Sequence, residues 1–230
     1  MRAMDTRELI DAITNKVLAE LGRGSTPASQ PAAQPSPPAP LLIPAGISNR
    51  HLHISREDLD VLFGQGHELT MRNPLKQPGE FACAETVTLA GPRHAIEHVR
   101  ILGPLRNRTQ VEISQTDAVT LGVKAPVRCS GDLAGTPGIT IVGPRGTVVI
   151  REGVIRANRH IHILEPDAQR LGLKDKQIVA VKTIKSDKPT MFYNVMVRVL
   201  KNGFLELHID TDDGNAAGLR SDDLVELVVI

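Results

Sequence analysis

The sequence predicts a mainly β protein made of two small β-barrels that arise from an internal repeat and are flanked by short helices. Strand-like segments such as "TVTLAGPR" and "GITIVGPRGTVVI" are short and contain Gly-Pro turns, unlike a parallel sheet with long helices. A short signal near position 50, "NRHLHIS", returns near position 160 as "NRHIHIL". Aromatic residues make up only 2% of the chain, so the core must consist of Leu, Ile, Val and Ala.

Composition and charge exclude several classes of protein. The 230 residues carry a formal charge of +1 and no run of Lys or Arg, which argues against nucleic acid as a partner. Cys83 and Cys129 are too few for a disulfide framework and lack zinc-ribbon spacing, so we expect reduced thiols in a cytoplasmic protein. No apolar run approaches the roughly 20 residues of a membrane helix, and the N-terminus lacks the apolar segment of a signal peptide.

Residues 1–22 predict an amphipathic helix. Its apolar stripe consists of Leu9, Ile10, Ile13, Val17, Leu18 and Leu21. Residues 23–43 are rich in Pro, Ala and Ser and predict a linker, which makes this N-terminal helix a flexible attachment. The stripe suits the chain's own core, a second copy of the helix, or a groove on another protein. We favour recruitment to another protein, because the long tether makes docking on its own domain optional.

Both His-X-His segments predict a strand followed by a short helix. Alternate residues of a strand share a face, so His51 and His53 lie on one side and Leu52 and Ile54 on the other. Ser55 suits the start of the following helix. The second copy offers matching features: His160 and His162 on one face, Pro166 in the first helical turn and Gly172 at the helix end. We therefore divide the body into two repeats, each a small barrel, at residues 44–151 and 152–230.

The repeat extends beyond the histidine pairs. His51 and His160 are offset by 109 residues, and the segments that end in Gly122 and Gly218 resemble each other at an offset of 96. The second offset places Glu112 opposite His208. Each half thus supplies a histidine pair and one further residue of a metal-ligand type.

Two imidazoles on one face of a strand can converge on one metal ion. Zinc takes His nitrogens and carboxylate oxygens, and catalytic zinc keeps one position open for water or substrate. The sequence therefore predicts two zinc ions per chain, bound by two sets of residues: His51, His53 and Glu112; His160, His162 and His208. A single histidine usually has a structural or surface role, whereas two matched pairs favour metal. Imidazole also suits copper and iron.

The paired segments, together with "GPLRNRTQVEIS" and "DTDDGNAAGL", closely resemble the phosphate propanoyltransferase family of propanediol utilisation, a phosphotransacylase type associated with bacterial microcompartments. The resemblance covers residues 44–230. It implies two small barrels that exchange strands and a dinuclear zinc site with the same six ligands. It also implies transfer of a short acyl group, from propanoyl-CoA or acetyl-CoA, between coenzyme A and phosphate.

The resemblance also implies roles for other residues. Arg106, in "GPLRNR", matches the phosphate-binding arginine, and Ser48, Arg100, Leu102 and Asn215 match coenzyme A contacts. The CoA sulfur would belong to the ion bound by the first set of ligands. The N-terminal helix corresponds to an encapsulation peptide, with a shell or cargo protein as partner and the microcompartment lumen as location. On pattern alone, Arg106 is typical of a surface arginine beside a turn, and Arg100 of an outward strand residue.

Two other functions stay open on the sequence. A dinuclear zinc hydrolase often carries His-X-His-X-Asp-His, but "HLHISRED" has Ser at the Asp position and no following His. A metal-stapled barrel could instead be a non-enzymatic scaffold, although the absence of cysteine ligands argues against closed structural sites. The low net charge and the many β edges favour self-association.

Overall fold

The computed structural model describes residues 6–22 and 40–230 in two units, each described here by itself. The N-terminal unit holds one described helix, α1, at Thr6–Gly22, where the sequence predicts a helix. The first five residues and most of the predicted linker lie outside the described residues. Within residues 6–22 and 40–230, no helix is long and apolar enough to cross a membrane.

The second unit begins at Pro40 and contains the remaining elements. Its strands are β1 (Leu42–Ser48), β2 (His51–His53), β3 (Met71–Pro74), β4 (Phe81–Ala90), β5 (Ala95–Gly103), β6 (Gln110–Glu112), β7 (Val127–Arg128), β8 (Ile139–Val142), β9 (Thr147–Ile150), β10 (Val154–Ala157), β11 (His160–Leu164), β12 (Ile178–Thr183), β13 (Met191–Leu200), β14 (Glu206–Asp210) and β15 (Leu224–Val228). Its helices are α2 (Arg56–Phe63), α3 (Gln115–Leu121), α4 (Glu165–Arg170) and α5 (Thr211–Ala217).

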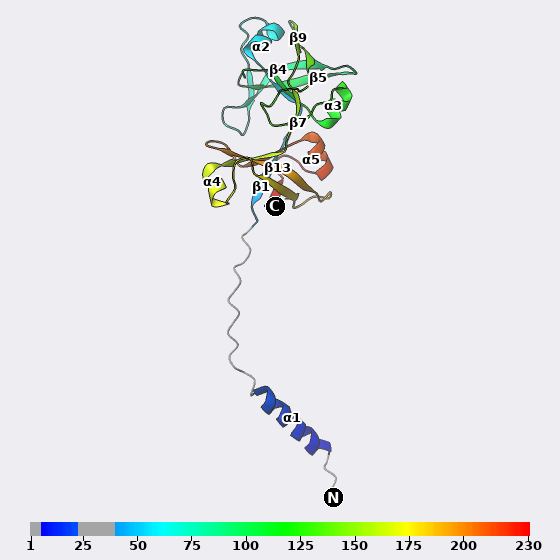
Figure 1. Cartoon of the computed structure of the whole chain (residues 1–230), viewed down its shortest axis with the longest axis vertical. Helices are drawn as coiled ribbons and strands as arrows, with labels where there is room; N and C mark the ends of the chain where they lie inside the picture. The colour runs from blue at the N-terminus through cyan, green and yellow to red at the C-terminus, as the bar shows by residue number, and fades with distance from the viewer. Residues whose placement is uncertain (1–5, 23–39) are drawn as a thin grey trace. The chain divides into compact units, whose positions relative to one another are not determined.

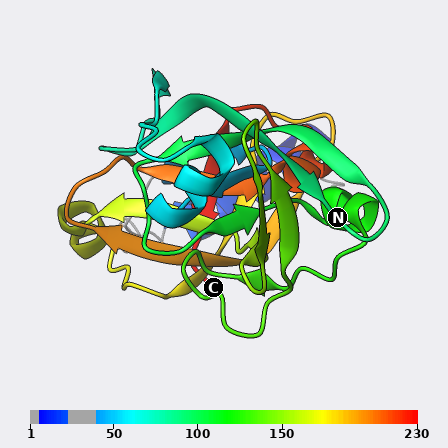
Figure 2. The ribbon, with the colours of Figure 1, turned by 90° about the horizontal axis from the view of Figure 1, so that it is seen from above.

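The strands form one closed barrel and one open sheet. The barrel has the order β1-β14-β11-β13-β12-β15, and the nine-stranded sheet has the order β7-β10-β6-β2-β5-β4-β8-β9, with β3 added to β4. The open sheet lies at one end of the unit with α2 and α3, and the barrel at the other end with α4 and α5 (Figure 1). Seen from above, α2 (cyan) lies over the strands near the middle of the unit (Figure 2). The predicted mainly β fold with short helices is confirmed, with one barrel closed and the other a half-barrel.

The chain crosses between the two sheets immediately before each His-X-His strand. β1 belongs to the closed barrel, where it runs parallel to β14, whereas β2 belongs to the open sheet. β10 belongs to the open sheet, parallel to β6, whereas β11 belongs to the barrel. The two sheets thus exchange one strand each, and the sequence halves 44–151 and 152–230 differ from the sheets by that exchange.

Each sheet encloses its own aliphatic core. Leu52 and Ile54 are fully buried in the core of the open sheet. Ile161 and Ile163 are fully buried in the core of the barrel. Burial of each such side chain stabilises the fold by about 1.5–3 kcal/mol. This burial fixes the register of both strands, because a slip of one residue would exchange isoleucine or leucine for histidine in the core.

The short helices begin at residues that cap their N-termini. Ser55 caps α2, as the sequence predicts. Ser114 and Asp117 form a capping box at the start of α3. The Asp210 carboxylate accepts the Asp213 backbone N–H at the start of α5. Asp117 and Asp213 therefore occupy the same position in matching helices, and both contribute to the site.

Candidate metal centre

Before each histidine pair, at the point where the chain crosses from one sheet to the other, an Asn-Arg segment forms an ion pair with a nearby helix. Arg50 Nε donates to Asp117 Oδ1 at 2.8 Å. Arg159 Nε makes the matching bond to Asp213 Oδ2 at 2.7 Å. Because both carboxylates lie in the first turn of a helix, each ion pair joins that helix to the strand that carries the histidines. The repeated Asn-Arg therefore positions the histidines from outside the ligand set.

The asparagine backbone sets the tautomer of the first histidine in each pair. Nδ1 of His51 lies 2.8 Å from the carbonyl oxygen of Asn49, and Nδ1 of His160 lies 2.8 Å from that of Asn158. A carbonyl oxygen only accepts, so Nδ1 carries the proton and Nε2 keeps its lone pair. Histidines that bind metals usually make such a bond with the other ring nitrogen.

In both halves, the third predicted ligand lies directly across the neighbouring antiparallel strand. β2 and β6 pair His51 with Glu112, and β11 and β14 pair His160 with His208. The ligand atoms of the N-terminal triad (His51, His53 and Glu112) lie within 4.8 Å of one another. In the C-terminal triad (His160, His162 and His208), the ring centroids lie 4.8, 5.0 and 4.6 Å apart. The N-terminal triad is thus a group that could hold a metal ion.

The buried ring nitrogens of the triads fit a metal. Among the described residues, His53 Nδ1 and both ring nitrogens of His162 are buried without a hydrogen-bond partner. An unpaired buried polar atom costs about 1–3 kcal/mol unless something else satisfies it. Burial and the neighbouring His51 lower the pKa of His53 to about 4. Burial and His208 lower the pKa values of His160 and His162 to about 3. These imidazoles are therefore neutral at pH 7, which is the form that binds metals. Together with the carboxylate of Glu112 they form a set of ligands that suits zinc.

Both triads line one cavity of about 600 Å³. Its walls come from both sheets, because each His-X-His strand begins where the chain crosses from one sheet to the other. Burial would raise the pKa of Glu112, but interactions with His51, His53 and His160 lower that pKa below the usual value, so Glu112 is an anion beside neutral imidazoles at pH 7. The two halves of the repeat therefore act on one carboxylate within one cavity.

The structure brings most of the other predicted site residues to this cavity. Arg106 lines the cavity, and its Nη2 donates to Glu80 Oε1 at 2.9 Å. Ser48 and Leu102 also line the cavity. Asn215, on α5, is exposed and lies outside the cavity lining. The phosphate and coenzyme A roles of these residues stay predictions.

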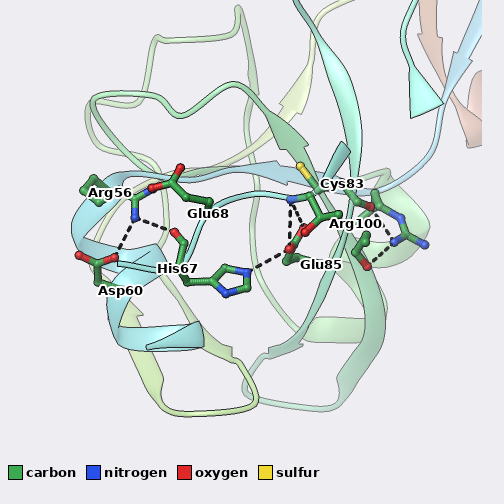
Figure 3. A network of polar contacts seen from close by, with 9 residues as sticks. Arg56, Asp60, His67, Glu68, Cys83, Glu85 and Arg100 are labelled. Carbon is green, nitrogen blue, oxygen red and sulfur yellow. Dashed lines mark hydrogen bonds and ion pairs between the residues drawn. The ribbon is translucent and has the colours of Figure 1, made fainter. Parts of the chain in front are cut away.

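Arg100, which also lines the cavity, is held by the neighbouring strand. Its Nη1 donates to the carbonyl oxygens of Cys83 and Ala84, each at 2.9 Å (Figure 3). These bonds fix the guanidinium at the cavity wall. Burial raises the pKa of the Cys83 thiol to about 11. At neutral pH Cys83 is therefore a protonated thiol rather than a nucleophile.

Several residues that support the triads were not predicted from the sequence. Gln110 Nε2 donates to Glu112 Oε1 at 2.6 Å, and His208 Nε2 donates to Glu206 Oε2 at 2.9 Å. Gln110 and Glu206 each lie two residues before the third ligand, so the alternation of the strand could have revealed them. Lys76 Nζ donates to Glu206 Oε1 at 2.8 Å, and no local pattern announces this contact across 130 residues.

Comparison with known proteins places the chain in a family. A family model described as phosphate propanoyltransferase matches residues 44–220. Relatives named phosphate propanoyltransferase include one from Thermotoga maritima, 56% identical over 80% of this chain and 87% of that protein. Another, from Rhodobacter capsulatus, is 49% identical over 82% of this chain and 87% of its own. A third, from Rhodopseudomonas palustris, is 43% identical over 96% of this chain and 97% of its own. The chain therefore belongs to the phosphate propanoyltransferase family, and it is an acyltransferase enzyme, as the resemblance predicts.

Proposed function

We propose that this phosphate acyltransferase interconverts short-chain acyl-CoA plus phosphate with acyl phosphate plus CoA at a site that holds two zinc ions. Propanoyl-CoA and acetyl-CoA are the proposed acyl donors. The observation that carries the proposal is that two triads and two predicted substrate-binding arginines line one cavity of about 600 Å³. A cavity of this size admits the reacting ends of two substrates.

Each triad would hold one zinc ion. The unpaired buried nitrogens of His53 and His162 support this assignment, as do the neutral imidazoles. Bound zinc supplies Lewis acidity toward a carbonyl oxygen and affinity for sulfur. The supporting residues Gln110 and Glu206 orient the third ligand of each triad through one hydrogen bond. The family resemblance assigns the CoA sulfur to the N-terminal triad.

The arginines would bind the anionic substrates. Arg106 presents a guanidinium fork that matches two oxygens of a phosphate dianion. The Glu80 carboxylate now pairs with this guanidinium at 2.9 Å, so phosphate would compete with it. Arg100, fixed by two backbone carbonyls, would contact coenzyme A together with Ser48 and Leu102. Holding both substrates in line would supply much of the rate enhancement.

The transfer needs no acylated residue of the chain. A phosphate oxygen attacks the thioester carbon, so that a C–O bond forms and the C–S bond breaks. CoA leaves as a thiolate and takes up the proton that hydrogen phosphate loses, which balances atoms and charge. The protonated Cys83 thiol agrees with this direct route.

The test is a thiol-release assay with propanoyl-CoA or acetyl-CoA, with and without phosphate. We expect free thiol to appear only with phosphate, to stop when a chelator removes the metal, and to return when zinc is restored. Thiol release in water alone would identify a hydrolase instead. Unfolding on metal removal, with no phosphate-dependent thiol release beforehand, would identify a scaffold.

We also propose that α1 recruits the enzyme to the lumen of a bacterial microcompartment through a shell or cargo protein. Its apolar residues Ile10, Ile13, Val17 and Leu18 are exposed. Removal of residues 1–39 should leave turnover unchanged and abolish co-sedimentation with microcompartments. Co-sedimentation of the shortened protein would contradict this role. Self-association stays a prediction that analytical ultracentrifugation can check.

A further inference from the structure

The two halves place an arginine at different positions beside their histidine pairs. The segments "VRIL" and "VRVL" bring Arg100 to β5 and Arg198 to β13. β5 runs parallel to β2 and pairs Arg100 with His51, the first histidine of its pair. β13 runs parallel to β11 and pairs Arg198 with His162, the second histidine. The shift of two residues keeps both arginines on the histidine face of their strands.

The shift changes what surrounds the guanidinium. Arg100 is held by two backbone carbonyls, whereas Arg50 pairs with Asp117 and Arg106 with Glu80. Arg198 lines the same cavity and is half-buried. Within residues 6–22 and 40–230, its side chain makes no ion pair and no hydrogen bond. A half-buried guanidinium with unused donors in a cavity wall is a ready anion-binding group.

The charge of the adjacent triad points to a dianion. The N-terminal triad contains one carboxylate, Glu112, whereas the C-terminal triad consists of three imidazoles. The register of β13 and β11 places Arg198 directly beside His162, and both residues line the cavity, so the positive charge of Arg198 lies next to that triad. The carboxylate beside the C-terminal triad, Glu206, is already paired with Lys76, so it leaves the charge of Arg198 free to attract an anion.

We infer that Arg198 is a second binding residue for the phosphoryl oxyanion of inorganic phosphate and acyl phosphate. This inference rests on the proposed function and adds to Arg106. A guanidinium beside His162 would hold the oxyanion at the C-terminal triad, away from the side assigned to sulfur. Arg106 is already paired with Glu80 and Arg100 with two backbone carbonyls, so Arg198 offers a guanidinium that no partner occupies among the described residues.

The experiment compares Arg198→Ala with wild type and with Arg170→Ala, an exposed arginine of α4 that serves as the matched control. In Arg198→Ala the KM for phosphate should rise at least about tenfold, because a charge-assisted bond is lost. The KM for acyl-CoA should stay within about twofold, and bound zinc per chain, by mass spectrometry, should not change. Arg198→Lys should recover part of the phosphate affinity, since it keeps the charge and loses the fork.

A second measurement does not depend on turnover. Calorimetric titration of inorganic phosphate into the zinc-loaded proteins should show the same loss of affinity in Arg198→Ala and none in Arg170→Ala. Equal phosphate affinity in wild type and Arg198→Ala would overturn the inference. A rise in the KM for acyl-CoA alone would assign Arg198 to the CoA phosphates, and loss of zinc would make it a structural residue; either result overturns it. If wild type shows no phosphate-dependent thiol release, the proposed function fails, and the titration still decides on Arg198. If Arg198→Ala does not fold, Arg198→Lys provides both measurements.

Discussion

The N-terminal and C-terminal triads occupy the same register positions but distribute their charge differently. In the first half, the carboxylate is the third ligand, Glu112, and its support is the neutral amide of Gln110. In the second half, the third ligand is His208 and the carboxylate is its support, Glu206. Each half therefore carries one carboxylate at these two positions, in exchanged places. The repeat preserves geometry while it varies the charge that reaches the cavity.

The different positions of the carboxylate in the two halves also explain a contact between the two sheets. The Glu206 carboxylate is buried and accepts from Lys76, which belongs to the segment between β3 and β4 of the open sheet. Burial opposes ionisation of Glu206, but the hydrogen bonds from His208 and Lys76 lower its pKa below the usual value. Gln110 is neutral and needs no such cation; Ser130 and the Gly131 backbone complete its hydrogen bonds. A buried carboxylate in the supporting position thus requires a cation from the other sheet.

The largest expected effect comes from removing the third ligand of either triad. Glu112→Ala and His208→Ala should each lose about one zinc ion per chain. Turnover should fall by at least about 10³-fold, since a metal ion contributes several kcal/mol to transition-state stabilisation and each 1.36 kcal/mol is a factor of ten. Mass spectrometry and the thiol-release assay measure both. His94→Ala, at an exposed histidine outside the cavity, is the control. An unchanged zinc content in either variant would remove that residue from the ligand set.

The next effect concerns the ion pairs that fix the crossing points. The Asp117 side chain is 4% exposed and the Asp213 side chain 20% exposed. Asp117→Ala should therefore lower the free energy of unfolding by about 2–4 kcal/mol, because the nearly buried carboxylate holds Arg50 and also accepts the Ser114 backbone N–H of the capping box. Asp213→Ala should cost about 1–3 kcal/mol. Urea unfolding measures both.

The surface ion pair Asp167–Arg170 provides the control for this comparison. Its side chains are 38% and 64% exposed, so Asp167→Ala should change stability by less than about 1 kcal/mol. A larger cost for Asp213→Ala than for Asp117→Ala would show that burial does not set the difference between the two crossing points.

A smaller effect is expected at the supporting residues. Gln110→Ala and Glu206→Gln should each weaken zinc binding by about 10–100-fold at one triad and leave the other unchanged, because such partners orient the ligand without touching the metal. Competition with a chromogenic chelator measures the two affinities. Equal weakening at both triads in either variant would mean that the two halves are not independent, and the comparison between them would fail.

Much of this site could be predicted from local pattern. The alternation of His51 and His53 with Leu52 and Ile54 predicts which face enters the core, and both apolar residues are fully buried. The repeat offsets predict that Glu112 and His208 are equivalent residues, and each lies across the neighbouring strand from the first histidine of its pair. The helix start at Ser55 follows from the preference for capping residues.

Contacts between distant segments could not be predicted from the sequence. The residue pattern of β1 predicts a strand, but it does not predict that this strand pairs with β14 in the other half of the chain. The contacts of Arg50 with Asp117 and of Lys76 with Glu206 span 67 and 130 residues, so no periodicity or capping rule reports them. Burial and sheet pairing decide these contacts, and both depend on the whole fold.

The smallest expected effect tests why β1 has a glycine beside the C-terminal triad. Gly46 lies opposite His208, and a Cβ there would approach Glu206 Cδ at 2.8 Å. Ile155 lies at the matching position opposite Glu112 in the first half. The Glu206 carboxylate is held by two hydrogen bonds and cannot yield freely, so Gly46→Ala should cost about 1 kcal/mol of stability. It should also weaken zinc binding at the C-terminal triad by up to about tenfold, because it displaces Glu206, the residue that supports His208.

The control is Ile155→Val at the matching position. It should cost about 0.5–1.5 kcal/mol of stability through lost packing and leave zinc affinity unchanged. Urea unfolding and chelator competition on both variants decide the point: equal zinc affinity in Gly46→Ala and wild type would mean that the glycine serves packing alone.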